Sequence, residues 1–225
     1  MTADNGLAGG IVASNPAGGK IVSCVNEGNV NSNLGYAGGI AAENWGTIQG
    51  CSVGTAAQRI TVRSRGTTEA GAVCAVNHAE AVIDNSSLVS EANVTLDGDG
   101  KVYGGVTGLN EGTVRNRTLT AMPDINANGM TGLSVGGAAG VNQSSIIKIT
   151  GQQNFENFSN YRYLGGIAGE NTAGAAITDC SYAGEMTESS GASAGNCYGG
   201  IAGINAGEVS CCRTENLTMN IQGAY

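Results

Sequence analysis

The chain has 225 residues, with 10 lysine and arginine residues against 18 acidic ones, and a formal net charge of −8. Ten cations spread along the sequence form no basic stripe, which argues against binding to nucleic acid or to an anionic membrane surface. No apolar run approaches the roughly 20 residues that cross a bilayer, so membrane insertion is not expected. Glycine is abundant at 38 residues, but 2 prolines and a hydrophobic share of 41% exclude a collagen-like or disordered chain. The opening residues, MTADNGLAGG, lack the cationic start and apolar stretch of a signal peptide.

A short phrase recurs seven times along the chain, for example GGIAAEN, GGIAGEN and GGIAGIN. Each copy ends in an asparagine, and the copies are 29 to 34 residues apart. These asparagines are Asn15, Asn44, Asn77, Asn110, Asn142, Asn171 and Asn205. A repeat of this period across the whole chain predicts one repeat domain over residues 1–225, as a fragment of a larger surface protein.

Strands fit these units better than helices. A glycine pair costs roughly 1 kcal/mol per residue inside a helix. Within each phrase, Ile or Val, then Gly or Ala, then Asn occupy alternate positions, which places them on one face of a strand. A second strand carries a β-branched residue, and a third alternates in residues 59–63, 93–96 and 217–221. The expected β-branched positions are Ile21, Ile48, Val82, Val114, Ile147, Ile177 and Val209. Three short strands per unit predict an all-β parallel β-helix of seven coils, right-handed by the usual rule for parallel crossovers.

Stacking the coils would align equivalent residues in columns about 4.8 Å apart. The asparagines would then form an amide ladder, each side chain bonding its neighbours above and below. A second column contains only small residues, which would keep that part of the interior narrow. Its members are Ala13, Ala42, Ala75, Gly108, Gly140, Gly169 and Gly203.

The segments GGIAGENTAGAAITDCSYAG and GGIAGINAGEVSCC, which start at Gly165 and Gly199, resemble the GLUG motif. The third repeat departs most from that pattern, with Ala72 in place of its second glycine and His78 in its turn. GLUG repeats occur in bacterial secreted and surface proteins, including adhesin-like proteins and regions that flank the zinc peptidase domain of immunoglobulin-A-cleaving enzymes. The resemblance implies an extracellular or cell-surface location.

The histidine and acidic residues that could serve in catalysis are scattered along the sequence. A zinc peptidase needs a motif such as HExxH, but His78 is the single histidine, and we expect it to be a solvated turn residue. The DGDG segment at residues 97–100 is similar to a calcium loop, but it lacks further oxygen ligands at fixed spacing and predicts a tight turn. Glu43 and Glu170 share a repeat position four coils apart, too far for a catalytic pair. We therefore expect no catalytic residue, no metal and no cofactor.

The seven cysteines leave two interpretations open. Cys24, Cys51, Cys180 and Cys211 follow the second strand in four copies. Either they form a buried column of small apolar thiols, or neighbouring coils are joined by disulfides.

Two surfaces are candidates for binding. Val76, Leu109 and Val141 precede the asparagine in three successive copies and are predicted to form an exposed apolar strip, either a docking surface or one covered by the segments between coils. The segment at residues 151–164 carries Phe155, Phe158, Tyr161 and Tyr163 among Asn, Gln and Arg residues. Such aromatic residues suit contact with a sugar or a protein, and a local core under a longer loop is the alternative.

These observations favour a non-catalytic scaffold or adhesin-like module of a secreted or cell-surface bacterial protein, with a protein or glycan as partner. One alternative is a substrate-targeting module of a surface zinc peptidase whose catalytic domain is not in this chain. The other is a carbohydrate-active β-helix, which would need three or more charged side chains converging in one groove.

Overall fold

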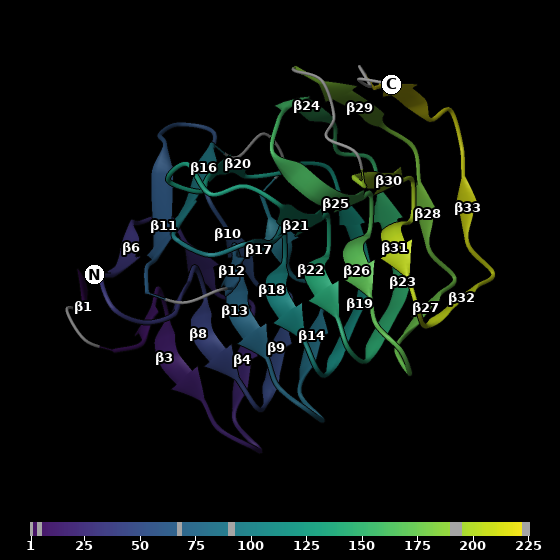
Figure 1. Cartoon of the computed structure of the whole chain (residues 1–225). Helices are drawn as coiled ribbons and strands as arrows, with labels where there is room; N and C mark the ends of the chain where they lie inside the picture. The colour runs from purple at the N-terminus through teal and green to yellow at the C-terminus, as the bar shows by residue number, and fades with distance from the viewer. Residues whose placement is uncertain (1, 4–5, 67–68, 90–92, 190–194, 222–225) are drawn as a thin grey trace.

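The computed structural model describes residues 2–3, 6–66, 69–89, 93–189 and 195–221, and in these residues the chain is all-β (Figure 1). All paired strands run parallel to their neighbours from preceding and following repeats. The strands stack into a solenoid in which two sheets have seven strands each, one from every repeat. The predicted parallel β-helix is therefore confirmed.

Successive strands of one coil belong to different sheets. Sheet A contains β1 (Thr2–Ala3), β6 (Val30–Ser32), β11 (Ile60–Ser64), β16 (Val94–Gly98) and β20 (Asp124–Asn126). Sheet B contains β2 (Ala8–Gly9), β7 (Ala37–Gly38), β12 (Glu69–Gly71), β17 (Val102–Gly104), β21 (Leu133–Gly136), β25 (Tyr161–Gly165) and β30 (Cys197–Gly199). Sheet C contains β3 (Val12–Asn15), β8 (Ala41–Asn44), β13 (Cys74–Asn77), β18 (Thr107–Asn110), β22 (Ala139–Asn142), β26 (Ala168–Asn171) and β31 (Ala202–Asn205).

The remaining strands complete each coil. Sheet D contains β4 (Lys20–Val22), β9 (Thr47–Gln49), β14 (Val82–Asp84), β19 (Thr113–Leu119), β23 (Ser145–Gly151), β27 (Ala176–Thr178) and β32 (Glu208–Ser210), with β28 (Ser181–Tyr182) and β33 (Arg213–Thr214) alongside. Sheet E contains β5 (Val25–Asn26), β10 (Ser52–Val53) and β15 (Ser87–Leu88). Sheet F contains β24 (Phe155–Phe158), β29 (Glu185–Glu188) and β34 (Thr218–Asn220). Three strands per coil was therefore an underestimate, because most strands of sheets B and E have only two or three residues and are too short to show an alternating pattern.

The asparagines lie in one column along sheet C. Each Nδ2 donates a hydrogen bond to Oδ1 of the asparagine in the next coil, at 2.7 or 2.8 Å, from Asn15 through to Asn205. The five members from Asn44 to Asn171 have no exposed surface. A buried amide that lacked these partners would be costly, so the ladder fixes the register of the stack.

The column of small residues lies where sheet C packs closely against sheet B. A Cβ built on Gly140 would be 2.7 Å from the backbone nitrogen of Tyr103, and one on Gly169 would be 2.6 Å from that of Val135. At Gly140 and Gly169, no side chain larger than hydrogen fits without a backbone shift.

The β-branched column of sheet D points into the core, with two corrections. The stacked residues are Ile21, Ile48, Ile83, Val114, Ile146, Ile177 and Val209. Val82 and Ile147 were wrong by one position, because each of these strands has two adjacent β-branched residues. A shift of one residue moves a side chain to the opposite face, and the sequence offered no second marker to choose between them.

Each coil bends at sheet D through a residue with a left-handed backbone, which follows the strand in five coils and lies within β19 and β23 in the other two. The seven equivalent residues all have φ between 49° and 61°: Ser23, Gly50, Asn85, Asn116, Lys148, Asp179 and Cys211. Glycine, asparagine and aspartate adopt this region readily, whereas serine, lysine and cysteine do so at a cost.

Candidate functional site

The predicted apolar strip is not an exposed surface. Val76 is only 3% exposed, and Leu109 and Val141 are partly buried. The residue beside Val76 in the neighbouring strand is Glu43, whose carboxylate lies 3.3 Å from Nε2 of His78. Val76 is therefore not part of an exposed strip, and only Leu109 and Val141 keep some exposed surface.

His78 is also not the solvated turn residue that was predicted. Its Nδ1 lies 3.1 Å from Glu111, in addition to the contact of Nε2 with Glu43. Its ring stacks on Trp45 with centroids 3.9 Å apart and planes 9° from parallel. Sequence reasoning missed this cluster, although Trp45, His78 and Glu111 each follow the ladder asparagine in successive coils, so that parallel stacking aligns them.

The sheet stack is interrupted between β20 and β24. Sheet A ends at β20 and sheet F begins at β24, although these strands occupy the corresponding place in successive coils. On both sides of the interruption the coils remain paired, through β19 with β23 and β21 with β25. In Figure 1, β24 and β29 lie apart from the run of β11, β16 and β20. Two free strand edges therefore face one opening.

A cavity of about 490 Å³ occupies this opening, which we call the cleft. This volume is within the range of about 300–1,000 Å³ typical of ligand sites. One wall is the segment from Met122 to Leu133, and the other is the segment from Asn154 to Tyr161. The lining includes apolar side chains from both walls: Met122, Ile125, Met130, Leu133, Phe155 and Phe158.

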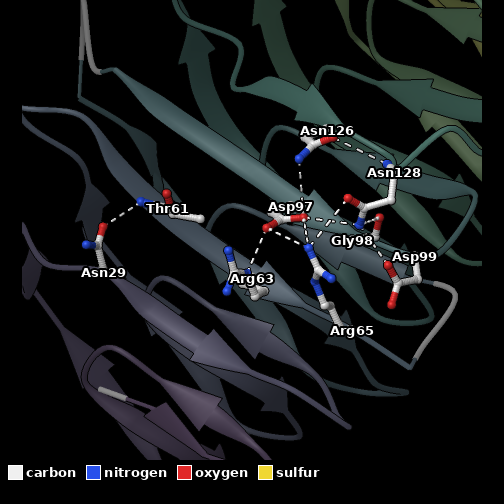
Figure 2. Close-up of polar contacts among 9 residues, drawn as sticks. All are labelled: Asn29, Thr61, Arg63, Arg65, Asp97, Gly98, Asp99, Asn126 and Asn128. Carbon is white, nitrogen blue, oxygen red and sulfur yellow. Dashed lines mark hydrogen bonds and ion pairs between the residues drawn. The ribbon is translucent and has the colours of Figure 1, made fainter.

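A buried carboxylate anchors the first wall. Asp97 on β16 is 4% exposed and accepts hydrogen bonds from Nε of Arg63 at 2.7 Å and from Arg65 at 3.2 Å. Nδ2 of Asn128 donates to the same carboxylate at 3.2 Å, and Asn126 lies at 3.5 Å. Figure 2 shows Asp97 between the two arginines and the two asparagines. The network ties β20 and the turn after it to the two preceding coils.

The charges of this network act on Asp97 itself. Burial tends to raise the pKa of the Asp97 carboxyl, but the hydrogen bonds and charges of Arg63 and Arg65 outweigh it and hold the pKa below its usual value. The DGDG segment is therefore not an isolated tight turn as predicted: Asp97 and Gly98 end a strand, and Asp97 is occupied by cationic and amide partners.

The second wall rests on the predicted aromatic cluster, most of which is packed internally. The rings of Phe158 and Tyr161 stack with centroids 5.3 Å apart, and Tyr198 meets Phe158 edge-on at 5.3 Å. Phe155 and Phe158 are only 5% and 4% exposed. The structure thus supports the local-core alternative for both phenylalanines, although they and Tyr161 also line the cleft. Tyr163 does not line it and packs under Arg162 at 5.0 Å.

The charged side chains that line the cleft are both acidic. Asp124 lies on the first wall and Glu156 on the second. Asp124 is paired at the rim with Arg59 at 2.6 Å, whereas Glu156 contacts Nδ2 of Asn154 at 3.4 Å. Burial, followed by the charge of Asp124, raises the pKa of the Tyr161 hydroxyl, so Tyr161 stays neutral.

All seven cysteines are free thiols in this structure, which agrees with the interpretation as apolar residues rather than disulfides. Ser181 pairs with Arg213, which aligns Cys180 with Cys212, so Cys211 was the wrong member of this column. Burial raises the pKa of Cys180 to about 12. Cys211 instead takes the left-handed bend and is exposed.

Within the described ranges, no group of three or more His, Cys, Asp or Glu side chains has a geometry suited to a metal ion. None of the described residues belongs to a helix with the length and apolar character to cross a bilayer. No family model matches the chain, and no curated protein or solved structure is significantly similar to it.

The cleft could not have been located from the sequence alone. Its first wall follows no repeat pattern, and the one available signal was Pro123, one of two prolines in the chain. A proline cannot donate to a sheet ladder and is typical of a strand edge. The aromatic residues of the second wall pointed to this region without revealing that it faces an opening.

Proposed function

We propose that this chain is a non-catalytic repeat scaffold, an adhesin-like module of a secreted or cell-surface bacterial protein, which holds a partner in the cleft between β20 and β24. The interruption of the sheet stack is the observation that carries this proposal. Sheets B, C and D and the asparagine ladder continue across this point, so the interruption is confined to the place that sheets A and F occupy.

The chemistry of the cleft supports binding rather than turnover. Its lining carries two carboxylates, and one of them, Asp124, is already paired with Arg59. A carbohydrate-active groove would need more converging charged groups than these. The resemblance of the repeats to the GLUG motif supports the surface location.

The test is selection of ligands from a peptide-display library and from a glycan array, with the wild-type chain and two variants. Met130→Trp fills the rim of the cleft, where Met130 is 36% exposed. Leu34→Trp places the same ring at an exposed position outside the lining. We expect ligands that bind the wild type and Leu34→Trp and not Met130→Trp, and that are recovered intact by mass spectrometry. Cleavage of the ligand, or no ligand that distinguishes the variants, would contradict the proposal.

A further inference from the structure

The strands on the two walls of the cleft each have one backbone edge without a strand partner. The backbone of β20 pairs with β16 on one side only, and that of β24 pairs with β29 on one side only. Among the described residues, no backbone hydrogen bond joins residues 124–126 to residues 154–158. Unpaired edges of parallel strands are templates for an added strand.

We infer that the cleft receives an extended peptide with basic side chains, which adds as a strand between β20 and β24 and closes the break between sheets A and F. This inference rests on the proposed function and names the class of partner.

The side chains of the cleft fit the two faces of such a strand. Alternate residues of an added strand point to opposite sides. One side meets Met122, Ile125 and Met130 of the first wall, which keep exposed apolar surface and suit β-branched residues. Methionine adapts to irregular apolar surfaces.

The acidic side chains of the cleft favour basic residues on the other side of the peptide. The lining contains Asp124 and Glu156 and no lysine, arginine or histidine. Within the described part of the chain Glu156 makes no ion pair, so a lysine or arginine of the peptide would be its partner. Acidic peptides would meet like charge on both walls.

A glycan is the less favoured occupant. Binding of a sugar on an aromatic platform needs an exposed ring face. Both phenylalanines are nearly buried, and Phe158 already contacts the rings of Tyr161 and Tyr198.

The chain itself supplies a suitable probe. The segment Arg-Ile-Thr-Val-Arg-Ser, residues 59–64, includes a strand of sheet A that bonds to neighbours on both sides. The experiment measures binding of this hexapeptide, capped at both ends and fluorescently labelled, to the full chain by anisotropy at low salt. Three comparison probes are the same peptide with glutamate for both arginines, the peptide with proline for its valine, and a chitin hexasaccharide.

We expect the basic peptide to bind and the proline peptide to lose binding, because proline removes a backbone donor. The acidic peptide should bind roughly tenfold more weakly, because it loses the ion pair with Glu156 and brings like charge to both walls. Met130→Trp should abolish binding, and Leu34→Trp should retain it. Glu156→Lys should reverse the preference between basic and acidic peptides, whereas the same change at the exposed Glu27 should not.

Four other binding results would contradict the inference or part of it. Binding of the basic peptide that survives Met130→Trp places it outside the cleft and overturns the inference. Equal binding of the proline peptide excludes strand addition. Binding of the saccharide alone overturns the inference but leaves the proposed function standing, and binding of neither probe contradicts both.

Discussion

Nδ2 of Asn110 donates to Oδ1 of Asn142 at 2.8 Å, and neither residue has any exposed surface. The same Nδ2 lies 3.1 Å from the carbonyl of Ser145 in the next coil, and Asn110 accepts from Asn77 on its other side. This one side chain therefore joins three successive coils. The ladder holds the spacing of the coils on which the cleft depends.

Replacement of Asn110 by alanine should lower the free energy of unfolding by about 1–3 kcal/mol, because Asn77 and Asn142 would each lose a buried partner. Asn205→Ala is the control. Asn205 is exposed at the last coil, so water replaces the lost partner and the cost should stay within about 0.5 kcal/mol. Urea denaturation of both variants measures the difference. Equal losses would show that the ladder contributes no more inside the stack than at its end.

Gly140→Ala should be destabilising by about 1–3 kcal/mol, because its methyl group would overlap the backbone of Tyr103. Gly28→Ala is the matched control, since a Cβ there would lie 3.7 Å from the nearest atom, an ordinary contact. Thermal unfolding compares the two. A Gly140→Ala variant as stable as Gly28→Ala would mean that sheets B and C are not in close contact.

Lys148→Asn should stabilise the chain by about 0.5–1 kcal/mol, because asparagine tolerates the left-handed bend at φ 55° better than lysine does. The equivalent residues Asn85 and Asn116 already show that asparagine fits this bend. Lys101→Asn makes the same chemical change at an exposed residue outside it. A midpoint of thermal unfolding that rises no more for Lys148→Asn than for Lys101→Asn would contradict this prediction.

Asp97→Asn should cost about 1–3 kcal/mol at pH 7, since Arg63 and Arg65 lose their shared carboxylate. The pKa of Asp97 is lower in the folded chain than in the unfolded one, so its stabilising effect is complete above the ordinary carboxyl pKa of about 4. That effect is lost as the pH falls through the lower, folded-state pKa. Denaturation across this acid range should therefore show the wild type converging on Asp97→Asn. A constant gap between them would mean that Asp97 does not carry this pH dependence.

The repeat made the fold predictable, and departures from it made the site unpredictable. Asn44, Asn77 and Asn110 recur at one repeat position, so their alignment followed directly from parallel stacking. Val82 failed because its neighbour Ile83 satisfies the same pattern from the opposite face. The cleft arises from a missing pairing between residues 124–126 and 155–158, which is a relationship between coils that a single-sequence pattern does not encode.

The burial of Val76 has a similar explanation. Val76 lies in the predicted column with Glu43 and Leu109, but the exposure of its side chain depends on side chains from other coils. His78 and Glu43 come together only when the third coil stacks on the second. A prediction based on one repeat cannot include such contacts.

Hydrogen–deuterium exchange tests the central claim most directly, namely that the break between β20 and β24 is an open site that a strand closes. In the free chain, amides in these two strands should exchange faster than amides in the fully paired strands β16 and β29. Saturation with the peptide of residues 59–64 should slow exchange at residues 124–126 and 155–158 and leave the ends of the solenoid unchanged. Equal protection of all four strands in the free chain, or peptide-induced protection confined to the solenoid ends, would contradict the account.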